Sequence, residues 1–215
     1  MTPLVDVVVM TDFPLDVGVR VVAEGPGRLR LSSSAGWMPP AYLGAINAVA
    51  TGAGWYDETT ADLISVALDN ALVFREHLGW RPFPSLGASV EAGVGIAALG
   101  GAPTVAGLLG AATGREFPVD QGATPYELSA TVVMIDVVLG WEGVIADHLV
   151  IRGDVGGAFT VGANVNAERV GEARFALGES LLEQVEVESE LYLEETIRRY
   201  VHSPTLSLAV GWRFP

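Results

Sequence analysis

The sequence predicts an all-β fold, in which residues 1–215 form one domain, an eight-stranded antiparallel up-and-down barrel that spans a membrane. Its mean hydropathy of +0.39 is high for a chain dissolved in water. Even so, no stretch approaches the roughly 18 consecutive apolar residues of a spanning helix. Apolar and polar residues instead alternate with period two, which is typical of strands. A closed barrel is the strand architecture that satisfies every backbone hydrogen bond in lipid.

Eight segments show this alternation, and the first is the weakest because three valines follow one another at 7–9. The segments are 4–10, 16–24, 28–38, 71–80, 86–98, 127–141, 146–159 and 204–214. Turn residues at 24–27, 81–85 and 141–143 alternate with long connections at 39–70, 99–126 and 160–203. Short turns on one side and long loops on the other are typical of membrane barrels, and the link at 11–15, short where a long one is expected, is the exception. Within the long loops, helical spacing predicts helices near 42–51, 59–71, 105–112 and 170–201.

The two faces of the predicted strands differ sharply in charge. One face is apolar and carries a single charged residue, Glu76. Glu76 has three interpretations: a bulge that reverses the face locally, a protein contact, or an error in the assigned register. The complementary face holds small residues with six acids and six arginines between them: Asp6, Asp16, Glu24, Glu91, Asp136 and Asp154, and Arg20, Arg28, Arg30, Arg75, Arg152 and Arg213. Small residues and paired charges suit the narrow interior of an eight-stranded barrel, so we expect the apolar face to point outward.

The charged face predicts a network inside the barrel. Its expected members are Arg20, Arg30, Arg75, His77, Glu91, Asp136, His148, Arg152, Asp154 and Arg213. A static network that fills the lumen is the favoured interpretation, because charges in a narrow interior must be paired. The alternative is a selectivity lining or a gated salt bridge in which the arginines favour anions. His77 and His148 could also meet and bind a metal, although interior hydrogen bonds are the simpler expectation.

Aromatic residues lie near the ends of the predicted strands, on the apolar face. These residues are Trp37, Trp80, Trp141, Trp212 and Phe214. Aromatic girdles at the two membrane–water interfaces have this placement. A soluble, lipocalin-like barrel with an apolar ligand inside remains the alternative, because alternation alone does not say which face is outside.

The last segment, Leu206 to Phe214, alternates apolar residues and ends in an aromatic residue, followed by Pro215. This pattern resembles the C-terminal strand of outer-membrane β-barrels, and the strand layout is similar to the small barrels of the OmpA, OmpX and OmpW type. The resemblance implies a location in the bacterial outer membrane, contact with the lipid bilayer, and insertion by the barrel assembly machinery. Residues 1–6 lack the pattern of a signal peptide, so we expect a mature chain with an added start Met.

Composition narrows the function further. A net charge of −14 argues against nucleic-acid binding. The chain has no cysteine, and all of its basic residues are arginines, which excludes a P-loop lysine. We expect a monomeric, non-enzymatic protein without cofactor or metal, which has a structural role or binds an unknown extracellular ligand through its helical loops. A narrow channel and a membrane-embedded hydrolase or acyltransferase are the other functions considered.

Overall fold

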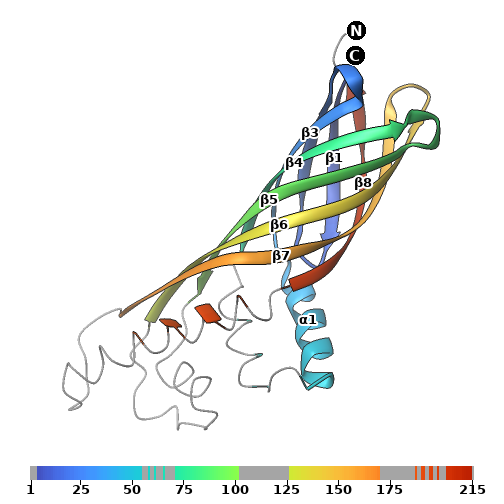
Figure 1. The fold of residues 1–215 in the computed structure, drawn as a ribbon. Coiled ribbons are helices and arrows are strands. Elements are labelled where there is room, and N and C mark those ends of the chain that lie inside the picture. The colour runs from blue at the N-terminus through green and yellow to red at the C-terminus, as the bar shows by residue number, and fades with distance from the viewer. Residues whose placement is uncertain are drawn as a thin grey trace, which may run out of the picture.

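In the computed structural model, eight strands form a closed antiparallel barrel, in which each strand pairs with the next and β8 returns to β1 (Figure 1). The structure describes residues 4–54, 71–101, 126–169 and 202–214, together with 58, 61, 65, 187, 190, 191, 194, 195 and 198. The strands are β1 (Leu4–Phe13), β2 (Asp16–Glu24), β3 (Leu29–Trp37), β4 (Leu72–Phe83), β5 (Ala88–Gly101), β6 (Tyr126–Ile145), β7 (Leu149–Arg169) and β8 (His202–Phe214). The predicted all-β, eight-stranded antiparallel barrel is confirmed.

The two ends of the barrel differ. The connections β2–β3, β4–β5 and β6–β7 are short and lie at the end where the chain also begins and finishes, which we call the terminus end (Figure 1). The opposite, loop end carries the tight β1–β2 turn and the helix that follows β3. Two of the short turns contain 3-10 turns, at Pro26–Arg28 and Pro84–Leu86.

Residues 4–10, the weakest of the predicted segments, do form the first strand. β1 extends three residues further than the alternation indicated and pairs with β2 from Leu4 to Asp12 and with β8 from Val5 to Phe13. The barrel therefore closes through this strand, and the valine run at 7–9 does not interrupt it, because either face of the barrel wall accepts valine.

The β6–β7 hairpin corrects the sequence prediction most strongly. The expected turn at 141–143 is strand, and the chain instead turns at 146–148, where Ala146 and Asp147 have positive φ angles. β7 also continues to Arg169, through ten residues that we expected to lie in a loop. Trp141 pairs with Gly153 inside the ladder. The glycine at 143 indicates a turn in the sequence, but cross-strand pairing on both sides keeps it extended.

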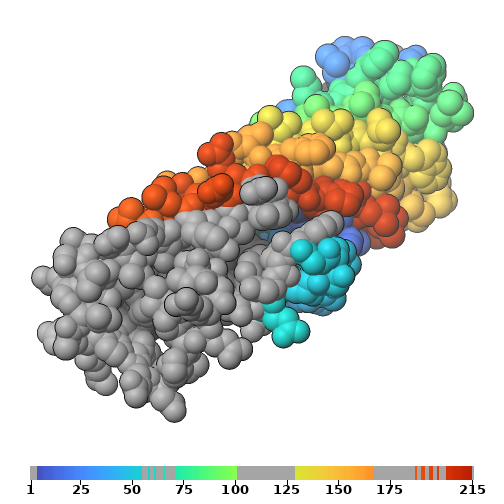
Figure 2. Space-filling model, turned by 60° about the horizontal axis from the view of Figure 1, so that its bottom comes forward, coloured from blue at the N-terminus to red at the C-terminus, as the bar shows by residue number. Residues whose placement is uncertain are grey.

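One predicted helix is described and confirmed, α1 (Pro40–Gly52), which stands at the edge of the loop end (Figure 2). Pro40 at its first turn has the φ angle that a helix start requires. The Tyr42 hydroxyl is hydrogen-bonded to the Thr11 hydroxyl of β1, and its ring packs edge-on against Phe13 at 5.1 Å between centroids. The helix expected at 105–112 lies outside the described residues, as do most residues of those expected at 59–71 and 170–201; residues 61 and 65 of the former and 187, 190, 191, 194, 195 and 198 of the latter are helical. No helix in the described ranges is long and apolar enough to cross a membrane.

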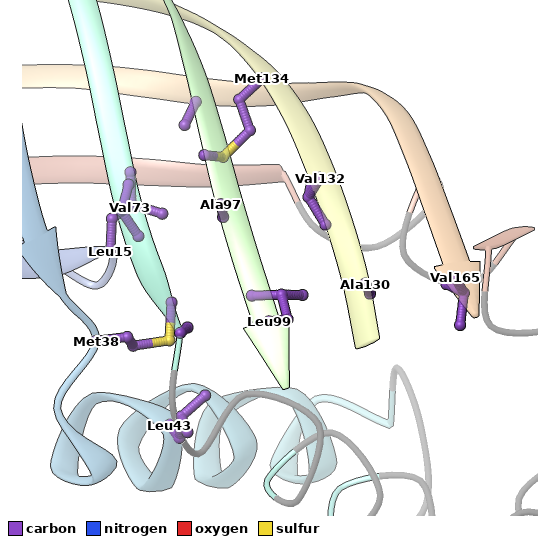
Figure 3. Packing of buried hydrophobic residues seen from close by; sticks show 12 residues of the cluster. Leu15, Met38, Leu43, Val73, Ala97, Leu99, Ala130, Val132, Met134 and Val165 are labelled. Carbon is purple, nitrogen blue, oxygen red and sulfur yellow. The ribbon is translucent and has the colours of Figure 1, made fainter. Parts of the chain in front are cut away.

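The interior at the loop end is apolar. Inward-facing side chains of β4 to β7 pack with Leu15 of the β1–β2 turn, with Met38, and with Leu43 of α1 (Figure 3). The strand members are Val73, Ala97, Leu99, Ala130, Val132, Met134, Ala158 and Val165. Leu43 therefore joins α1 to the barrel interior, and this cluster fills the loop end of the lumen.

Candidate functional site: the charged lumen

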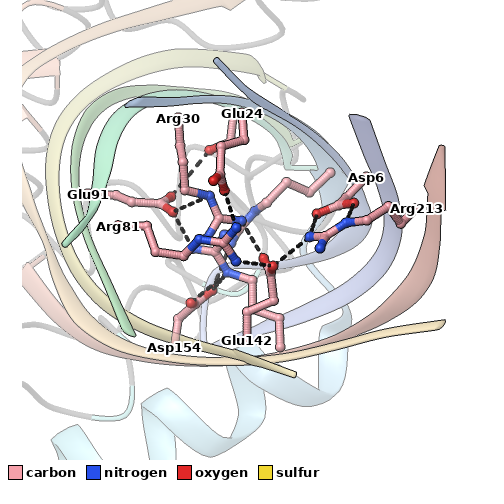
Figure 4. A network of polar contacts seen from close by, with 11 residues as sticks. Asp6, Glu24, Arg30, Arg81, Glu91, Glu142, Asp154 and Arg213 are labelled. Atoms are coloured by element: carbon pink, nitrogen blue, oxygen red, sulfur yellow. Dashed lines mark hydrogen bonds and ion pairs between the residues drawn. The ribbon is translucent and has the colours of Figure 1, made fainter. Parts of the chain in front are cut away.

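Between the apolar cluster and the terminus end, charged side chains fill the barrel interior. Every one of the eight strands contributes at least one of them, because alternation points every second residue inward. They converge on the barrel axis from all sides of the wall (Figure 4). The described members are Asp6, Asp12, Asp16, Arg20, Glu24, Arg30, Arg75, His77, Arg81, Glu91, Asp136, Glu142, Arg152, Asp154 and Arg213.

At the terminus end, three arginines converge on Glu142 of β6. Arg30 donates to its Oε2, while Arg81 and Arg213 donate to its Oε1 at 3.0 and 2.6 Å. Arg213 also binds Asp6 in a two-pronged arrangement, with both hydrogen bonds at 2.7 Å. Asp6 is at the start of β1 and Arg213 at the end of β8, so this bidentate pair lies across the seam where the barrel closes.

In the middle of the lumen, Arg152 of β7 lies between two acids. Its Nη2 donates to Glu91 of β5 at 2.7 Å, and its Nε donates to Asp154 at 2.7 Å. Asp154 also accepts a hydrogen bond from Arg20 of β2 at 2.8 Å. The Arg152–Glu91 and Arg20–Asp154 contacts cross the interior, because β2, β5 and β7 are not neighbours in the sheet.

Next to the apolar cluster, Arg75 of β4 is the central cation. It donates to Asp12 and, at 3.2 Å, to Asp16, which places both sides of the β1–β2 turn within its reach. His77 Nε2 lies 3.3 Å from Asp136 Oδ2. Gly93 of β5 makes room for this imidazole, since a Cβ at that position would lie 2.6 Å from His77 Cδ2.

Two arginines join the three levels into one network. Arg30 connects Glu142 with Glu91, whose Oε1 lies 3.9 Å from its Nε. Arg20 connects Asp154 with Asp12, at 3.6 Å. Arg75 pairs with Asp12, and its Nη1 lies 3.9 Å from Asp136 Oδ2. The ion pairs thus continue without a break from the Asp6–Arg213 pair to Asp136.

The middle of the network is sealed from water. Arg20, Arg30, Arg75 and Arg152 are each 2% exposed or less, although arginine is among the largest side chains. A water-filled channel at their level would leave these guanidinium groups accessible. The described part of the lumen is therefore filled by side chains.

The structure brings together nine of the ten lumen residues expected from the sequence, and His148 differs. His148 lies exposed in the β6–β7 turn and stacks on the ring of Trp212, with 5.2 Å between ring centroids. It does not meet His77, because the turn falls at 146–148 and not at 141–143. Among the described residues, no group of three or more histidine and acidic side chains is placed to hold a metal ion.

Six further lumen residues were not among the expected members of the network. Alternation had placed Asp6, Asp16 and Glu24 on the inner face, whereas Asp12, Arg81 and Glu142 were missed altogether. Each of the last three continues the inward alternation of its strand, two residues beyond Met10, Gly79 and Gly140. The signal was therefore present, but the predicted strands ended too early. Arg28, placed on the inner face by alternation, is exposed in the turn after β2 and donates to the Pro82 carbonyl at 2.7 Å.

The outer surface is apolar, and the predicted aromatic residues are part of it. Trp37, Trp80, Trp141, Trp212 and Phe214 are between 48% and 56% exposed. Trp80, Trp141, Trp212 and Phe214 lie toward the terminus end, and Trp37 lies at the loop end. Leu, Val, Ile and Phe side chains cover the wall between these levels.

The adjacent Ser203 and His202, which bear on hydrolase chemistry, are not directed at each other. The Ser203 hydroxyl donates to the Pro204 carbonyl at 3.0 Å. His202 Nδ1 accepts a hydrogen bond from the Thr160 backbone N–H at 3.2 Å. Within the described part of the chain, the Ser203 hydroxyl is therefore not paired with His202 as a nucleophile is with its base.

Comparison with solved structures identifies the fold. A major outer membrane protein from Thermus thermophilus matches over 100% of both chains, with a TM-score of 0.50 and 15% sequence identity. The chain has the fold of an outer-membrane β-barrel protein. The N-terminal β-barrel domain of Pseudomonas aeruginosa OprF also matches, over 99% of this chain and 96% of that one, at 8% identity and a TM-score of 0.45. Acinetobacter baumannii CarO matches over 98% and 97%, at 14% identity and a TM-score of 0.41. No family model matches the sequence, and no curated protein matches it.

Proposed function

We propose that this chain is a bacterial outer-membrane protein that spans the lipid bilayer as a closed, non-conducting barrel and has a structural or binding role at the cell surface. One observation carries the proposal: arginines and carboxylates fill the interior, while tryptophan, leucine and valine cover the outside. A soluble barrel has the opposite distribution. Monomeric soluble proteins rarely expose contiguous apolar patches beyond a few hundred Å².

The strand lengths support insertion into a bilayer. The shortest strands, β2 and β3, have nine residues each. A tilted strand needs about 9–11 residues to cross the hydrocarbon core. The aromatic residues near both ends of the wall would then lie at the two interfaces. β8, which ends in Phe214, is the segment that we assign to recognition by the barrel assembly machinery.

The lumen favours a closed barrel over the channel considered from the sequence. The interior acids of the described residues outnumber the interior arginines, with Asp6, Asp12, Asp16, Glu24, Glu91, Asp136, Glu142 and Asp154 facing six guanidinium groups. An arginine-lined, anion-selective path is therefore not what these residues offer. Any binding role is assigned to the loop end, where α1 lies and which would face the extracellular side.

Two measurements test the proposal. First, the folded protein should require detergent and should migrate faster on a gel before heating than after it. Recovery of a monodisperse monomer without detergent would instead support the soluble barrel. Second, the protein should give no conductance steps in a planar bilayer, whereas the triple variant Arg20→Ser, Arg75→Ser, Arg152→Ser, which removes the middle of the network, should conduct. Steps from the unmodified protein would replace the closed barrel with a channel.

A further inference from the structure

Glu76 is the one charged residue on the outward face of the described strands that lies between the aromatic levels. Its position follows from regular pairing: it lies opposite Ser33 of β3 on one side and Val94 of β5 on the other. The irregularity of the β4–β5 ladder falls at Trp80 and Phe83, not here. A local bulge and a register error are therefore excluded, and a contact with another molecule remains.

Glu76 lies in the middle of the apolar wall. Along β4 it is four residues from Trp80 in one direction and four from Leu72 in the other, and Leu72 pairs with Trp37. With a rise of about 3.3 Å per residue and a tilt of about 45°, the carboxyl group is about 10 Å from either aromatic level. Hydrocarbon offers no hydrogen-bond partner at that depth.

The carboxyl group has only part of its hydrogen bonding satisfied. The Ser33 hydroxyl donates to Glu76 Oε2 at 2.8 Å. Its other oxygen, Oε1, has no partner among the described residues. Glu76 and Ser33 together form an outward-facing pair that can both donate and accept hydrogen bonds.

A groove of about 440 Å³ adjoins this pair on the side of the loop end. It interrupts the outer wall where small residues of β3 and β5 lie between larger side chains. It is lined by Ala35, Trp37, Leu72, Phe74, Ile96 and Ala98. The outer surface of β3, β4 and β5 thus combines a polar pair with a hollow and projecting aromatic rings.

We propose that this β3–β4–β5 face is the interface at which a second copy of the chain associates side by side in the bilayer. Two copies inserted in the same direction are related by a two-fold axis along the membrane normal. Rotation about such an axis leaves every residue at the same depth in the bilayer. The Glu76–Ser33 pair of one copy can therefore meet the same pair of the other. Each Ser33 hydroxyl continues to donate to the Oε2 of its own Glu76, and one proton taken up on association and shared between the two Oε1 atoms joins the remaining oxygens across the interface.

The self-complementary pair favours a second copy over other occupants. A lipid acyl chain can fill the groove but cannot hydrogen-bond to Glu76. Polar side chains and small residues are what bring membrane-embedded segments together. The ring of Phe74 and the groove lie at the same depth in both copies, so each ring has a hollow opposite it. A dimer differs from the monomer expected from the sequence, and it rests on the membrane insertion proposed above.

Cysteine cross-linking in lipid vesicles tests the interface, because the chain has no cysteine of its own. Val94→Cys places a thiol beside Glu76 and leaves the pair intact. Leu208→Cys is the matched control on β8: its side chain is 61% exposed, against 57% for Val94, and it lies four residues from Trp212. Oxidation should give disulfide-linked dimers of the Val94→Cys protein at about ten times the rate of the control.

Substitutions of the pair identify its role. In the Val94→Cys protein, Glu76→Leu and Ser33→Ala should each reduce the cross-linking rate severalfold. Glu76→Gln should retain it, because an amide also donates and accepts. Equal cross-linking at positions 94 and 208 would overturn the proposal, as would unchanged cross-linking after Glu76→Leu.

Two further measurements distinguish a failure of the proposed dimer from a failure of the proposed membrane insertion. Gel mobility before and after heating shows whether each variant is folded in the membrane. A folded, inserted protein without cross-links overturns the dimer alone, whereas a protein that does not insert overturns the proposed function. Native mass spectrometry from detergent adds the last outcome: a monomer that carries one lipid, which is lost in Glu76→Leu, would assign the groove to a lipid and overturn the dimer.

Discussion

Arg152 and Glu91 meet inside the barrel although β6 separates their strands, with Arg152 Nη2 2.7 Å from Glu91 Oε1. Backbone pairing fixes the distance between neighbouring strands but not the shape of the cross-section. A charged contact between strands two places apart holds that cross-section, and the Arg20–Asp154 pair does the same between β2 and β7. The interior network is therefore a set of cross-braces as well as a seal.

Removing one member of this network should destabilise the folded protein. Arg152→Met leaves Glu91 and Asp154 buried without their shared cation, and we expect a loss of about 3 kcal/mol in the free energy of unfolding. Urea unfolding in detergent micelles, followed by tryptophan fluorescence, measures it. The control is Arg28→Met in an exposed turn, which should change stability by at most about 0.5 kcal/mol.

The double variant Glu91→Gln, Arg152→Met should recover part of that loss, because the uncompensated carboxylate is then removed. Losses that simply add, with no recovery in the double variant, would show that the two side chains are not coupled.

The seam between β8 and β1 depends on Gly211. A Cβ at this position would lie 2.0 Å from the Val7 carbonyl oxygen and 2.5 Å from Val8 Cα, and both are backbone atoms that cannot move aside. Gly211→Ala should therefore strain the closure and reduce stability by about 1–3 kcal/mol.

Heat-dependent gel mobility and urea unfolding together report this loss. The matched control is Gly153→Ala on β7, where the nearest atom to a new Cβ is 3.8 Å away. Its stability should stay within about 0.5 kcal/mol of the unmodified protein. If Gly211→Ala were equally harmless, the close approach of β8 to β1 at this point would be disproved.

Alternation made the barrel and most of the lumen residues predictable, because it records which side each residue of a strand occupies. The phase of the pattern placed Arg20, Arg75 and Arg152 inside correctly. It did not predict where the strands end. A glycine is a local signal for a turn, but pairing with a neighbouring strand can keep that glycine extended. Gly143 was such a signal, and the shift of the turn to 146–148 moved His148 outside.

The partners within the network could not be predicted in the same way. Whether Arg152 binds Glu91 or another acid depends on closure of the barrel and on the relative stagger of strands that are far apart in the sequence. A single sequence contains no direct record of that stagger. For Glu76 the sequence was sufficient, because alternation placed it correctly on the outer face. The regular register of β3, β4 and β5 then showed that no bulge turns it inward.

The attachment of α1 should depend on Tyr42. Its hydroxyl contacts Thr11 and its ring packs on Phe13. Tyr42→Phe should lose about 1 kcal/mol from the local stability of the helix, since one hydrogen bond is removed. Tyr42→Ala should lose more, because the ring contact disappears as well.

Hydrogen exchange measured by mass spectrometry reports the local stability of α1. Amides of residues 41–52 should exchange faster in both variants, with those of β4 to β7 unchanged. Val49→Ala, on the exposed side of α1, serves as the control and should leave the exchange rates of the helix nearly unchanged. Unaltered exchange in Tyr42→Ala would mean that Leu43 alone holds the helix in place.

Tryptophan depth in the bilayer distinguishes the membrane barrel from a soluble one. In a variant that keeps Trp141 as its single tryptophan, bromine atoms near the lipid headgroups should quench the fluorescence more than bromine atoms near the chain ends, because an interfacial ring lies at headgroup level. In a tryptophan-free background, Leu208→Trp should show the opposite order, since position 208 lies four residues from Trp212, toward the middle of the apolar wall. The two variants have the same fold and are measured in the same lipid. A difference in which bromine position quenches more strongly therefore reports the depth of the tryptophan alone. Absence of quenching in both would place the outer wall in water and overturn the proposed insertion.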